Sequence, residues 1–321
     1  MKVFVTGGAG YIGSVCVEHL LDEGHEVCVW DNLSEGHREA VDSRAKWVEG
    51  DLGDREALKK TVKEFGPHAI MHFAASALVG ESMVNPSKYF RNNVANGLNL
   101  LDAAVAGDVS LFIFSSTCAT YGLPEKIPMD ERTPQRPINP YGQSKLMFEQ
   151  VLQWYEKIHG LKHVNLRYFN AAGASEKFGE DHRVETHLIP NILKVALEQK
   201  ECVEVFGDKH LTPDGTCIRD YIHVRDLARA HGLALQRKES ASYNVGTGEG
   251  YSVLQLIDIA RRVTGHAIPT VVKEARAGDP PRLVASAQRL MKELGWKPEF
   301  VKPQAIVESA WKWHQAHPNG Y

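Results

Sequence analysis

The 321-residue chain lacks the patterns that mark several large classes of protein. No apolar run approaches the roughly 20 residues that a membrane-spanning helix needs. The formal net charge of -3 provides no basic excess of the kind that nucleic-acid binding requires. The short apolar run after Met1 breaks at glycine, so it is too short for a secretory signal. We therefore expect a soluble, cytoplasmic protein whose partners include neither a membrane nor a nucleic acid.

Patterns of metal-binding residues are also scarce. The five cysteines are scattered without a CxxC pair, and the fifteen histidines show no HExxH or comparable spacing. Scattered cysteines in odd number are typical of a reducing compartment. We predict no metal site. We interpret Cys118 as a packed small hydrophobe rather than a nucleophile, because no histidine is placed by the sequence to activate it.

The first half of the chain alternates short β-branched runs with longer helical patterns. Strands are predicted at Val3–Thr6, His25–Trp30, Trp47–Glu49, Ala69–Phe73, Leu111–Ser115 and Val164–Tyr168. Helices are predicted at Tyr11–Asp22 and at about 55–65, 87–106 and 140–159. Such alternation implies right-handed crossovers and a parallel sheet covered on both faces. The predicted class is therefore α/β, with a doubly wound sheet of the Rossmann type.

After about residue 170 the alternation becomes less regular. Strand-like runs at Val203–Phe206 and Ser242–Val245 stand among helical patterns at about 187–199, 225–237, 253–263 and 303–315. We predict a dinucleotide-binding domain over residues 1–170. A smaller mixed α/β domain is predicted over residues 171–321, parts of which could dock back on the first.

The segment from Thr6 to Gly13 has the composition of a phosphate-binding turn. It follows a predicted strand and precedes a predicted helix, and its glycines would permit a tight turn and a close approach of the backbone to a pyrophosphate. The helix N-terminus adds free N–H groups and a partial positive charge. We predict a bound nicotinamide dinucleotide.

Two acidic strand ends favour one form of that cofactor. Asp31 follows Gly13 by 18 residues, where a carboxylate would accept from ribose hydroxyls and repel a 2′-phosphate. NAD is therefore predicted in preference to NADP, although Asp31 could instead be a simple turn residue. Asp51 and Leu52 would either flank the adenine or begin the helix that contains Arg55.

Tyr141 and Lys145 are four residues apart at the start of a predicted helix, so they share a face. The hydroxyl-rich run Ser115–Thr117 ends the preceding strand, at the edge where open α/β sheets bind ligands. A tyrosine with an ordinary pKa of about 10 needs roughly 4 kcal/mol of differential stabilisation to act as a base near pH 7. A neighbouring ammonium and a positive nicotinamide ring could supply it. Without the neighbouring signals, Tyr141 and Lys145 would be interpreted as two solvent-exposed side chains on one helix.

These and further segments together resemble the extended short-chain dehydrogenase/reductase family, over essentially the whole chain. The matching segments are TGGAGYIG (6–13), DNLS (31–34), HFAA (72–75), YFRNNV (89–94), FSSTCATYG (114–122), YGQSK (141–145), RYFNAAG (167–173), RDYIHVRDLA (219–228) and YNVG (243–246). The resemblance implies that NAD is held by Gly7, Gly10, Tyr11, Ile12, Gly13, Asp31, Asn32, Leu33, Ser34, Gly36, Asp51, Leu52, Phe73, Ala74, Ala75, Asn92, Ser115, Tyr141, Lys145 and Phe169.

The same resemblance implies a reaction in which the sugar is first oxidised and then reduced again, so that neither sugar nor cofactor shows a net redox change. Tyr141 would remove the proton of the sugar C4 hydroxyl while hydride passes to NAD. Thr117 would contact the C4 oxygen, and Lys145 would lower the pKa of Tyr141. Hydride would then return to the other face of the 4-keto sugar, which interconverts UDP-glucose and UDP-galactose. The implied UDP-sugar contacts are Thr117, Tyr141, Asn170, His187, Leu188, Phe206, Arg219, Arg276, Asp279 and Leu283.

Several positions depart from the family pattern or leave alternatives open. Thr117 replaces a serine but keeps the hydroxyl, and Ala77 replaces a lysine that touches the cofactor in some members. Leu283 stands where members that exclude N-acetylated sugars have tyrosine, so UDP-N-acetylhexosamines could be accepted. Without the resemblance, Arg219 and Arg276 would each be interpreted as one partner of a surface ion pair.

Other activities on the same fold remain open to different degrees. Epimerisation of UDP-glucuronate or a UDP-pentose is an alternative, because the sugar pocket is not readable from the sequence. A dehydratase or decarboxylase would usually have an acidic residue where Cys118 and Ala119 stand. A non-catalytic NAD-binding descendant would usually lose the tyrosine or the lysine.

The resemblance further implies a homodimer that pairs two helices of each chain, at about 88–106 and 142–159, as a four-helix bundle. Leu98, Leu101, Val151 and Trp154 are apolar enough to allow such pairing. The sequence alone does not separate this arrangement from burial within one chain.

Overall fold

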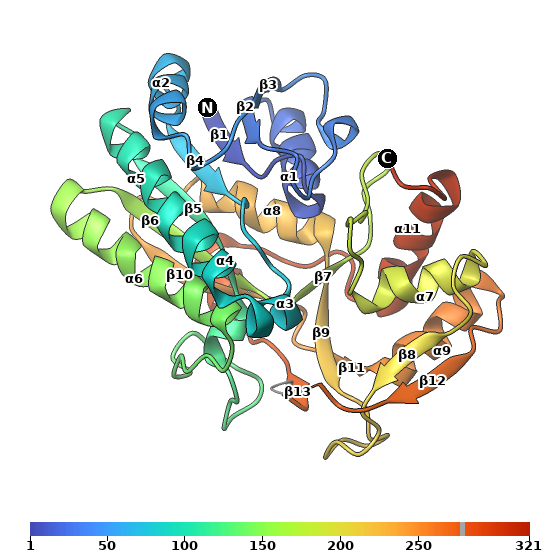
Figure 1. The fold of residues 1–321 in the computed structure, drawn as a ribbon. Helices are drawn as coiled ribbons and strands as arrows, with labels where there is room; N and C mark the ends of the chain where they lie inside the picture. Colours follow the sequence, from blue (N-terminus) through green and yellow to red (C-terminus); the bar gives the residue numbers. More distant parts are fainter. Residues whose placement is uncertain (277–279) are drawn as a thin grey trace. The chain divides into compact units, whose positions relative to one another are not determined.

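The chain folds into two units in the computed structural model, which describes residues 1–276 and 280–321 (Figure 1). The first unit comprises Met1–Leu123, Pro134–Tyr168 and Ala228–Tyr243. The second comprises Pro124–Thr133, Phe169–Leu227 and Asn244–Tyr321. The chain therefore passes between the units several times.

A seven-stranded sheet forms the centre of the first unit. Its strands are β1 (Lys2–Thr6), β2 (Glu26–Asp31), β3 (Lys46–Glu49), β4 (Ala69–His72), β5 (Leu111–Thr117), β6 (Lys162–Tyr168) and β10 (Ala241–Val245). Their order is β10-β6-β5-β4-β1-β2-β3, and the pairs that join β3 through to β6 are all parallel. The order β3-β2-β1-β4-β5-β6 is that of the doubly wound dinucleotide-binding fold. The predicted α/β class with a Rossmann-type sheet is confirmed.

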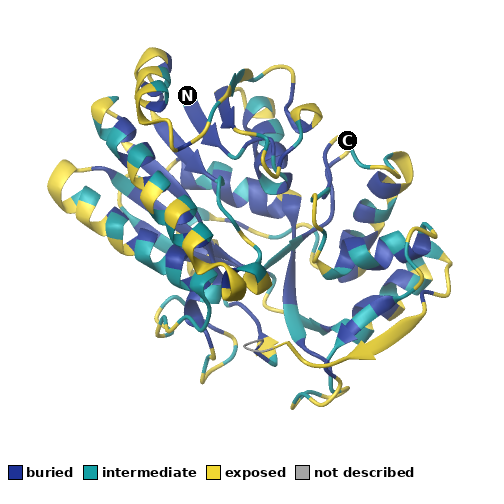
Figure 2. Cartoon of the chain, viewed as in Figure 1, coloured by how far each residue is buried: buried dark blue, intermediate teal, exposed yellow. Residues whose placement is uncertain are grey.

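Helices cover both faces of this sheet (Figure 1). They are α1 (Tyr11–Asp22), α2 (Arg55–Phe65), α5 (Asn96–Ala106), α6 (Pro140–His159) and α8 (Val224–Ala234), with short 3-10 turns η1 (Arg38–Ala40) and η3 (Cys118–Tyr121). One core joins apolar side chains of α2, α5 and α6 to the strands, with Phe112 and Phe148 fully buried in it. Figure 2 shows buried strands beneath helices whose outer faces are exposed. On α1 and α8, His19 and Gly232 lie against each other.

The segment before α5 corrects the predicted continuous helix at 87–106. The structure divides it into α3 (Val79–Val84), α4 (Pro86–Phe90), a π-helical turn η2 (Arg91–Ala95) and then α5. Asn85 caps α4 and Pro86 occupies its first turn, so a new helix begins there. Asn93 in η2 donates to the Ser76 carbonyl and to the hydroxyl of Ser144 on α6. These bonds hold the widened turn against its neighbours.

The second unit contains two small sheets and four helices among its described residues. β7 (Asn170–Ala172), β11 (Gly250–Ser252) and β13 (Arg282–Leu283) all pair with β9 (Ile218–His223), and β8 (Val203–Phe206) pairs with β12 (Thr270–Lys273). The helices are α7 (Leu188–Ala196), α9 (Val253–Thr264), α10 (Gln288–Leu294) and α11 (Pro303–Ala316). A second core joins α7, α9 and α11 to these strands. Within residues 1–276 and 280–321, the helices are too short or too polar to span a bilayer.

Candidate active site

The glycine turn lies at the point where the strand order of the first unit reverses. β1 runs between β2 and β4, so the loops that follow β1 and β4 emerge side by side. Gly7 has a φ of 75°, and a Cβ there would collide with the backbone of Ala74. The N–H groups of Phe73 and Ala74 donate to the Thr6 carbonyl at 2.9 and 3.1 Å. The predicted cofactor residues after β1 and β4 therefore share one edge of the sheet.

The N-terminus of α1 fits a pyrophosphate. Gly10 is its N-cap and has no side-chain capping bond, and the first turn holds no acidic residue. A Cβ on Gly13 would meet the Gly7 carbonyl, whereas Gly10 has no neighbour closer than 3.5 Å in the Cβ position. The turn therefore packs closely where Gly7 and Gly13 meet, and it leaves open space at its tip, Gly10. The partial positive charge of a helix N-terminus suits an anion at this open tip.

Asp31 ends β2 beside this turn. Its carboxylate accepts the N–H of Ala9 at 3.0 Å and that of Leu33 at 2.9 Å. Burial raises the pKa of Asp31, and these backbone hydrogen bonds oppose the rise. A carboxylate has about four acceptor positions, so capacity remains for ribose hydroxyls. Gly36 also packs here, because a Cβ on it would meet the backbone of Ala9.

The residues after Asp31 form a second part of the predicted cofactor site. Asn32 donates to Asp51 at 2.6 Å and accepts the Ser34 N–H at 3.0 Å. Leu33 has a φ of 57°, a left-handed conformation that is uncommon outside glycine and often occurs at functional sites. Asp54 rather than Asp51 caps α2, accepting the Ala57 N–H. The helix-cap alternative for Asp51 is therefore wrong, and the adenine contact of Asp51 and its buried neighbour Leu52 stays a prediction.

Tyr141 and Thr117 approach each other where β5 ends and α6 begins. The Thr117 hydroxyl accepts the Ala119 N–H at 3.1 Å and hydrogen-bonds the Tyr141 phenol. Desolvation raises the pKa of Tyr141 to about 12, although the bond from Thr117 opposes the rise. Tyr89 of α4 packs edge-on against the Tyr141 ring, with centroids 6.3 Å apart. The two predicted catalytic hydroxyls are therefore neighbours.

Lys145 lies one helical turn further along α6. Its Nζ donates to the Ser115 carbonyl at 2.8 Å and lies 4.9 Å from the centre of the Phe114 ring. Burial lowers the pKa of Lys145 to about 7, and the charge of Glu149 opposes that fall. A lysine near neutrality can exchange a proton at physiological pH. The structure thus brings together Ser115, Thr117, Tyr141 and Lys145.

Sequence reasoning missed a buried network beneath this centre. Glu149, the next residue on the Tyr141–Lys145 face of α6, accepts the Ser116 hydroxyl at 2.5 Å. Arg167 of β6 donates to both Glu149 oxygens, with the closest pair 2.6 Å apart. The available signal was the i, i+4, i+8 spacing along α6, which places Tyr141, Lys145 and Glu149 on one face.

Asn92, another predicted cofactor residue, lies in η2 and donates to Ser76.

In the second unit, strand register gathers three of the predicted substrate residues. Asn170 is paired with Tyr221 of β9, and Leu283 of β13 with Arg219 of β9. Arg219 and Tyr221 are two residues apart, so their side chains leave the same face of the sheet. Paired residues share that face as well. Asn170, Arg219 and Leu283 therefore belong to one side of one sheet.

The remaining predicted substrate residues occupy other parts of the same unit. The Arg276 guanidinium lies 3.9 Å from the centre of the Phe206 ring, which brings these two residues together. His187 is the N-cap of α7 and Leu188 its first residue. Asp279 lies outside the described residues. Phe169, a predicted cofactor residue, is buried just before β7.

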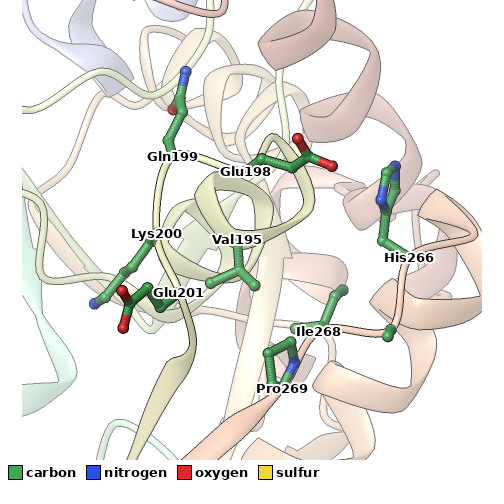
Figure 3. Close-up of a pocket in the computed structure, with 9 residues that line it drawn as sticks. Val195, Glu198, Gln199, Lys200, Glu201, His266, Ile268 and Pro269 are labelled. Atoms are coloured by element: carbon green, nitrogen blue, oxygen red, sulfur yellow. The ribbon is translucent and has the colours of Figure 1, made fainter.

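A hollow of about 390 Å³ lies between Val195 near the end of α7 and Ile268 before β12 (Figure 3). Its lining is made of short surface segments, including Glu198, Lys200 and His266. None of the predicted site residues lines it. The hollow therefore has no part in the chemistry described above.

These features match a known protein family. The model of the NAD dependent epimerase/dehydratase family matches residues 3–246. The chain belongs to this family. The match includes the glycine turn, Asp31, Thr117, Tyr141 and Lys145, which are the groups that the geometry had already brought forward.

This member of the NAD dependent epimerase/dehydratase family also has full-length relatives. It is 49% identical to the UDP-glucose 4-epimerase of Streptococcus mutans serotype c, over 100% of this chain and 99% of that one. A crystal structure of UDP-glucose 4-epimerase matches with a TM-score of 0.97 and 49% identity, covering 100% and 99% of the two chains. The Bifidobacterium longum UDP-glucose 4-epimerase in complex with NAD+ and UDP matches with a TM-score of 0.96 and 37% identity, covering both chains completely. The resemblance noted in the sequence is therefore confirmed.

Proposed function

We propose that this chain is an NAD-dependent 4-epimerase that interconverts UDP-glucose and UDP-galactose. The observation that carries the proposal is the Thr117–Tyr141–Lys145 arrangement at the end of β5 and the start of α6. It lies at the same edge of the parallel sheet as a glycine turn that fits a pyrophosphate. Full-length similarity to proteins named UDP-glucose 4-epimerase supports the choice of reaction.

In this reaction Tyr141 takes the proton of the sugar C4 hydroxyl and later returns it. Thr117 hydrogen-bonds both Tyr141 and the C4 oxygen, which gives the proton a short path. NAD held at the glycine turn and Asp31 would supply a reversible acceptor for the C4 hydride, and its positive ring would help to lower the pKa of Tyr141. Lys145 holds the nicotinamide ribose and supplies further positive charge near the phenol.

The pKa values of the protein's own groups define how much lowering Tyr141 needs. Its pKa of about 12 is roughly five units above neutrality. The Lys145 pKa of about 7 makes that side chain partly charged at neutral pH. A negative phenolate nearby would favour the charged lysine, so the two shifts reinforce each other once Tyr141 ionises.

The two faces of the 4-keto sugar can be reached by one hydride acceptor only if the sugar turns within the site. Binding energy must therefore fall on the nucleotide diphosphate. We assign this anchoring to the second unit, through Asn170, Arg219 and Leu283 on one sheet face and through the paired Phe206 and Arg276. Arginine suits a diphosphate because its guanidinium is planar, bidentate and always charged. NAD binding is assigned to the first unit.

The His187–Leu188 pair completes the proposed anchor. It begins α7, and the helix N-terminus there has no side-chain capping bond from His187. Free N–H groups at a helix start suit a phosphate or a uracil carbonyl.

The quaternary proposal is a homodimer formed through α5 and α6. Leu98 and Trp154 are exposed, with relative exposures of 36% and 58%. Leu101 is fully buried in the core of its own chain, and Val151 packs against that core, so neither supports a contact between chains. Ile158 is 66% exposed on α6 and adds to the apolar surface. We propose a cytoplasmic location, which suits an enzyme of nucleotide sugars.

Incubation of the purified protein with UDP-galactose, without added cofactor, tests the function directly. The expected product is UDP-glucose, with no loss of water or carbon dioxide. Denaturing the same preparation should release about one NAD per chain, because the hydride returns in every cycle and the cofactor need not leave. Conversion only of UDP-glucuronate or a UDP-pentose would select the alternative epimerase. No conversion of any UDP-sugar by an NAD-loaded protein would overturn the proposal.

A further inference from the structure

Four side chains with metal-binding atoms converge in the segment that leads into α7. They belong to Glu180, His182, Glu185 and His187, and one potential ligand atom of each lies within 4.8 Å of the others. Their spacing of two, three and two residues matches none of the motifs considered in the sequence. The loop, rather than a helix face, brings them together.

The distances between these atoms form the edges of a small polyhedron. Nδ1 of His182 lies 3.3 Å from a Glu185 oxygen and 3.4 Å from a Glu180 oxygen. Nδ1 of His187 lies 3.1 Å and 3.0 Å from oxygens of the same two residues. Tetrahedral zinc bonds of 2.0–2.2 Å to nitrogen and oxygen imply ligand-to-ligand edges of about 3.3–3.6 Å. A small outward shift of the side chains would therefore accommodate a four-coordinate ion.

The chemistry of the four groups also suits a divalent ion. Two carboxylates and two imidazoles, which would release their protons to solvent as the ion binds, would balance the charge of one divalent cation. This balance matters because the side chains of Glu180 and Glu185 are only 5% and 4% exposed. Imidazole favours transition metals such as zinc over calcium or magnesium. The side chains of His182 and His187 are 25% and 44% exposed, so an ion could enter from solvent.

Contacts around the cluster hold its ligands in place. Glu185 accepts the His187 N–H at 2.7 Å, which ties the carboxylate to the start of α7. Asn191 on the first turns of α7 donates to the carbonyls of His187 and Glu185 at 2.8 and 3.3 Å. Supporting bonds of this kind orient the ligands of known metal sites.

We propose that Glu180, His182, Glu185 and His187 form a four-coordinate site for a divalent transition-metal ion of the zinc type. The site lies wholly within the second unit, and it does not depend on the proposed epimerase activity. The alternative is a set of histidine–carboxylate ion pairs that binds no metal. The bound ion would fix the loop ahead of α7 and so stabilise the second unit.

Zinc content provides the first test. The full-length protein is stripped with a chelator, incubated with Zn²⁺ alone, dialysed and analysed for metal. The expected result is about one zinc per chain. Replacement by Co²⁺ should give the intense visible absorption of tetrahedral cobalt. Zinc content at background level, or a weak six-coordinate cobalt spectrum, would overturn the proposal without any variant.

Matched variants locate the site. Glu180→Gln and His182→Asn remove ligands that have no part in the proposed epimerase chemistry. Each should weaken Zn²⁺ affinity by at least about tenfold, since even changes to supporting residues cost that much. Glu176→Gln changes an exposed carboxylate just outside the cluster and should keep wild-type affinity. Equal affinity in all four proteins, with circular dichroism unchanged, would overturn the assignment.

Thermal unfolding gives an independent readout. Zn²⁺ should raise the Tm of the wild type and of Glu176→Gln, because a ligand that binds only the folded state stabilises it. The same addition should leave Glu180→Gln and His182→Asn nearly unchanged. A Tm increase shared by every variant would place the metal elsewhere. Epimerase activity does not enter these measurements, so their failure is distinct from failure of the proposed function.

Discussion

The Nζ of Lys145 donates a hydrogen bond of 2.8 Å to the carbonyl of Ser115. This bond joins α6 to β5 two residues before Thr117. One residue further along β5, the Ser116 hydroxyl donates to Glu149, which is also on α6. The helix that carries Tyr141 is therefore fastened at two adjacent points to the strand that carries Thr117. These two hydrogen bonds maintain the distance between the hydroxyls of Tyr141 and Thr117, on which the proposed proton transfer depends.

Tyr141→Phe removes the proposed base and keeps the aromatic ring. We expect turnover of UDP-galactose to fall by about 10²–10⁴-fold, the usual contribution of a positioned acid–base group. NAD released on denaturation should be unchanged. Tyr155→Phe is the matched control, because this tyrosine lies on the same helix and its hydroxyl bonds Asp102 instead. Near-normal turnover by Tyr141→Phe would show that another group is the base.

Glu149→Gln leaves Arg167 buried without its counter-charge. We expect the free energy of unfolding to fall by about 3–5 kcal/mol, as measured for buried ion pairs that lose one partner. Glu156→Gln is the control on the same helix, since its bond to Lys162 at 3.0 Å joins partly exposed groups. It should cost no more than about 1 kcal/mol. Equal losses of unfolding free energy for the two variants in urea would mean that the buried ion pair stabilises the protein no more than the partly exposed one.

Gly7→Ala and Gly66→Ala separate backbone strain from collision. Both glycines have positive φ, 75° and 62°, but a Cβ has open space at Gly66 and meets the Ala74 backbone at Gly7. Gly66→Ala should cost about 1–2 kcal/mol from strain alone. Gly7→Ala should cost at least about 2 kcal/mol more and should lower the amount of NAD that co-purifies. The glycine turn would lose its assigned role if NAD content stayed at the wild-type level.

We predict that the lowered pKa of His72 makes the folded protein less stable in acid. It is buried, pairs with the Thr6 hydroxyl at 2.7 Å, and has a pKa lowered to about 3 by burial and then by the charge of Lys145. Between pH 6.5 and 3 the unfolded chain binds a proton at this position that the folded protein does not. The free energy of unfolding therefore decreases as the pH falls, by up to about 1.4 kcal/mol per pH unit.

His72→Asn keeps an acceptor for Thr6 and removes the titration. Between pH 6.5 and 5, the wild type should lose about 2 kcal/mol more than this variant in urea unfolding. His159→Asn changes an exposed histidine and should follow the wild type. Parallel curves for wild type and His72→Asn would contradict the prediction.

Leu283 bears on the choice of sugar. It faces the same side of its sheet as Arg219, and leucine leaves more room than the tyrosine of members that exclude acetylated sugars. We expect the protein to epimerise UDP-N-acetylgalactosamine as well as UDP-galactose. Leu283→Tyr should reduce the first activity by about tenfold or more and affect the second only slightly. Absence of the acetylated product from the wild-type reaction would exclude this wider specificity.

Local signals in the sequence were sufficient to predict an element where neighbouring residues mark its start and its end. The helix predicted at 140–159 is present as α6, because Asn139 caps its first turn, Pro140 follows, and Gly160 ends it with a φ of 76°. The strands of the first sheet were recognisable because apolar β-branched runs are buried on both faces. The family motifs then indicated which strand ends would carry the chemistry.

Non-local contacts explain what the sequence missed. β9 overlaps the recognised segment at 219–228 but was not predicted as a strand, because it forms by pairing with partner strands of two or three residues each. The π-helical turn at Asn93 depends on a hydrogen bond to Ser144, which is 51 residues away. Arg167 needed the position of Glu149 before its role could be seen.

The sequence by itself therefore determined the glycine turn and the doubly wound class, because each is encoded by neighbours along the chain, and the family motifs indicated the candidate trio Thr117, Tyr141 and Lys145. Only the tertiary structure decided which side chains meet across elements. It joined Lys145 to Ser115, placed Asn170, Arg219 and Leu283 on one sheet face, and collected two glutamates and two histidines ahead of α7. The reason is physical: strand register and loop closure set these distances, and neither is expressed in the spacing of residues along the chain.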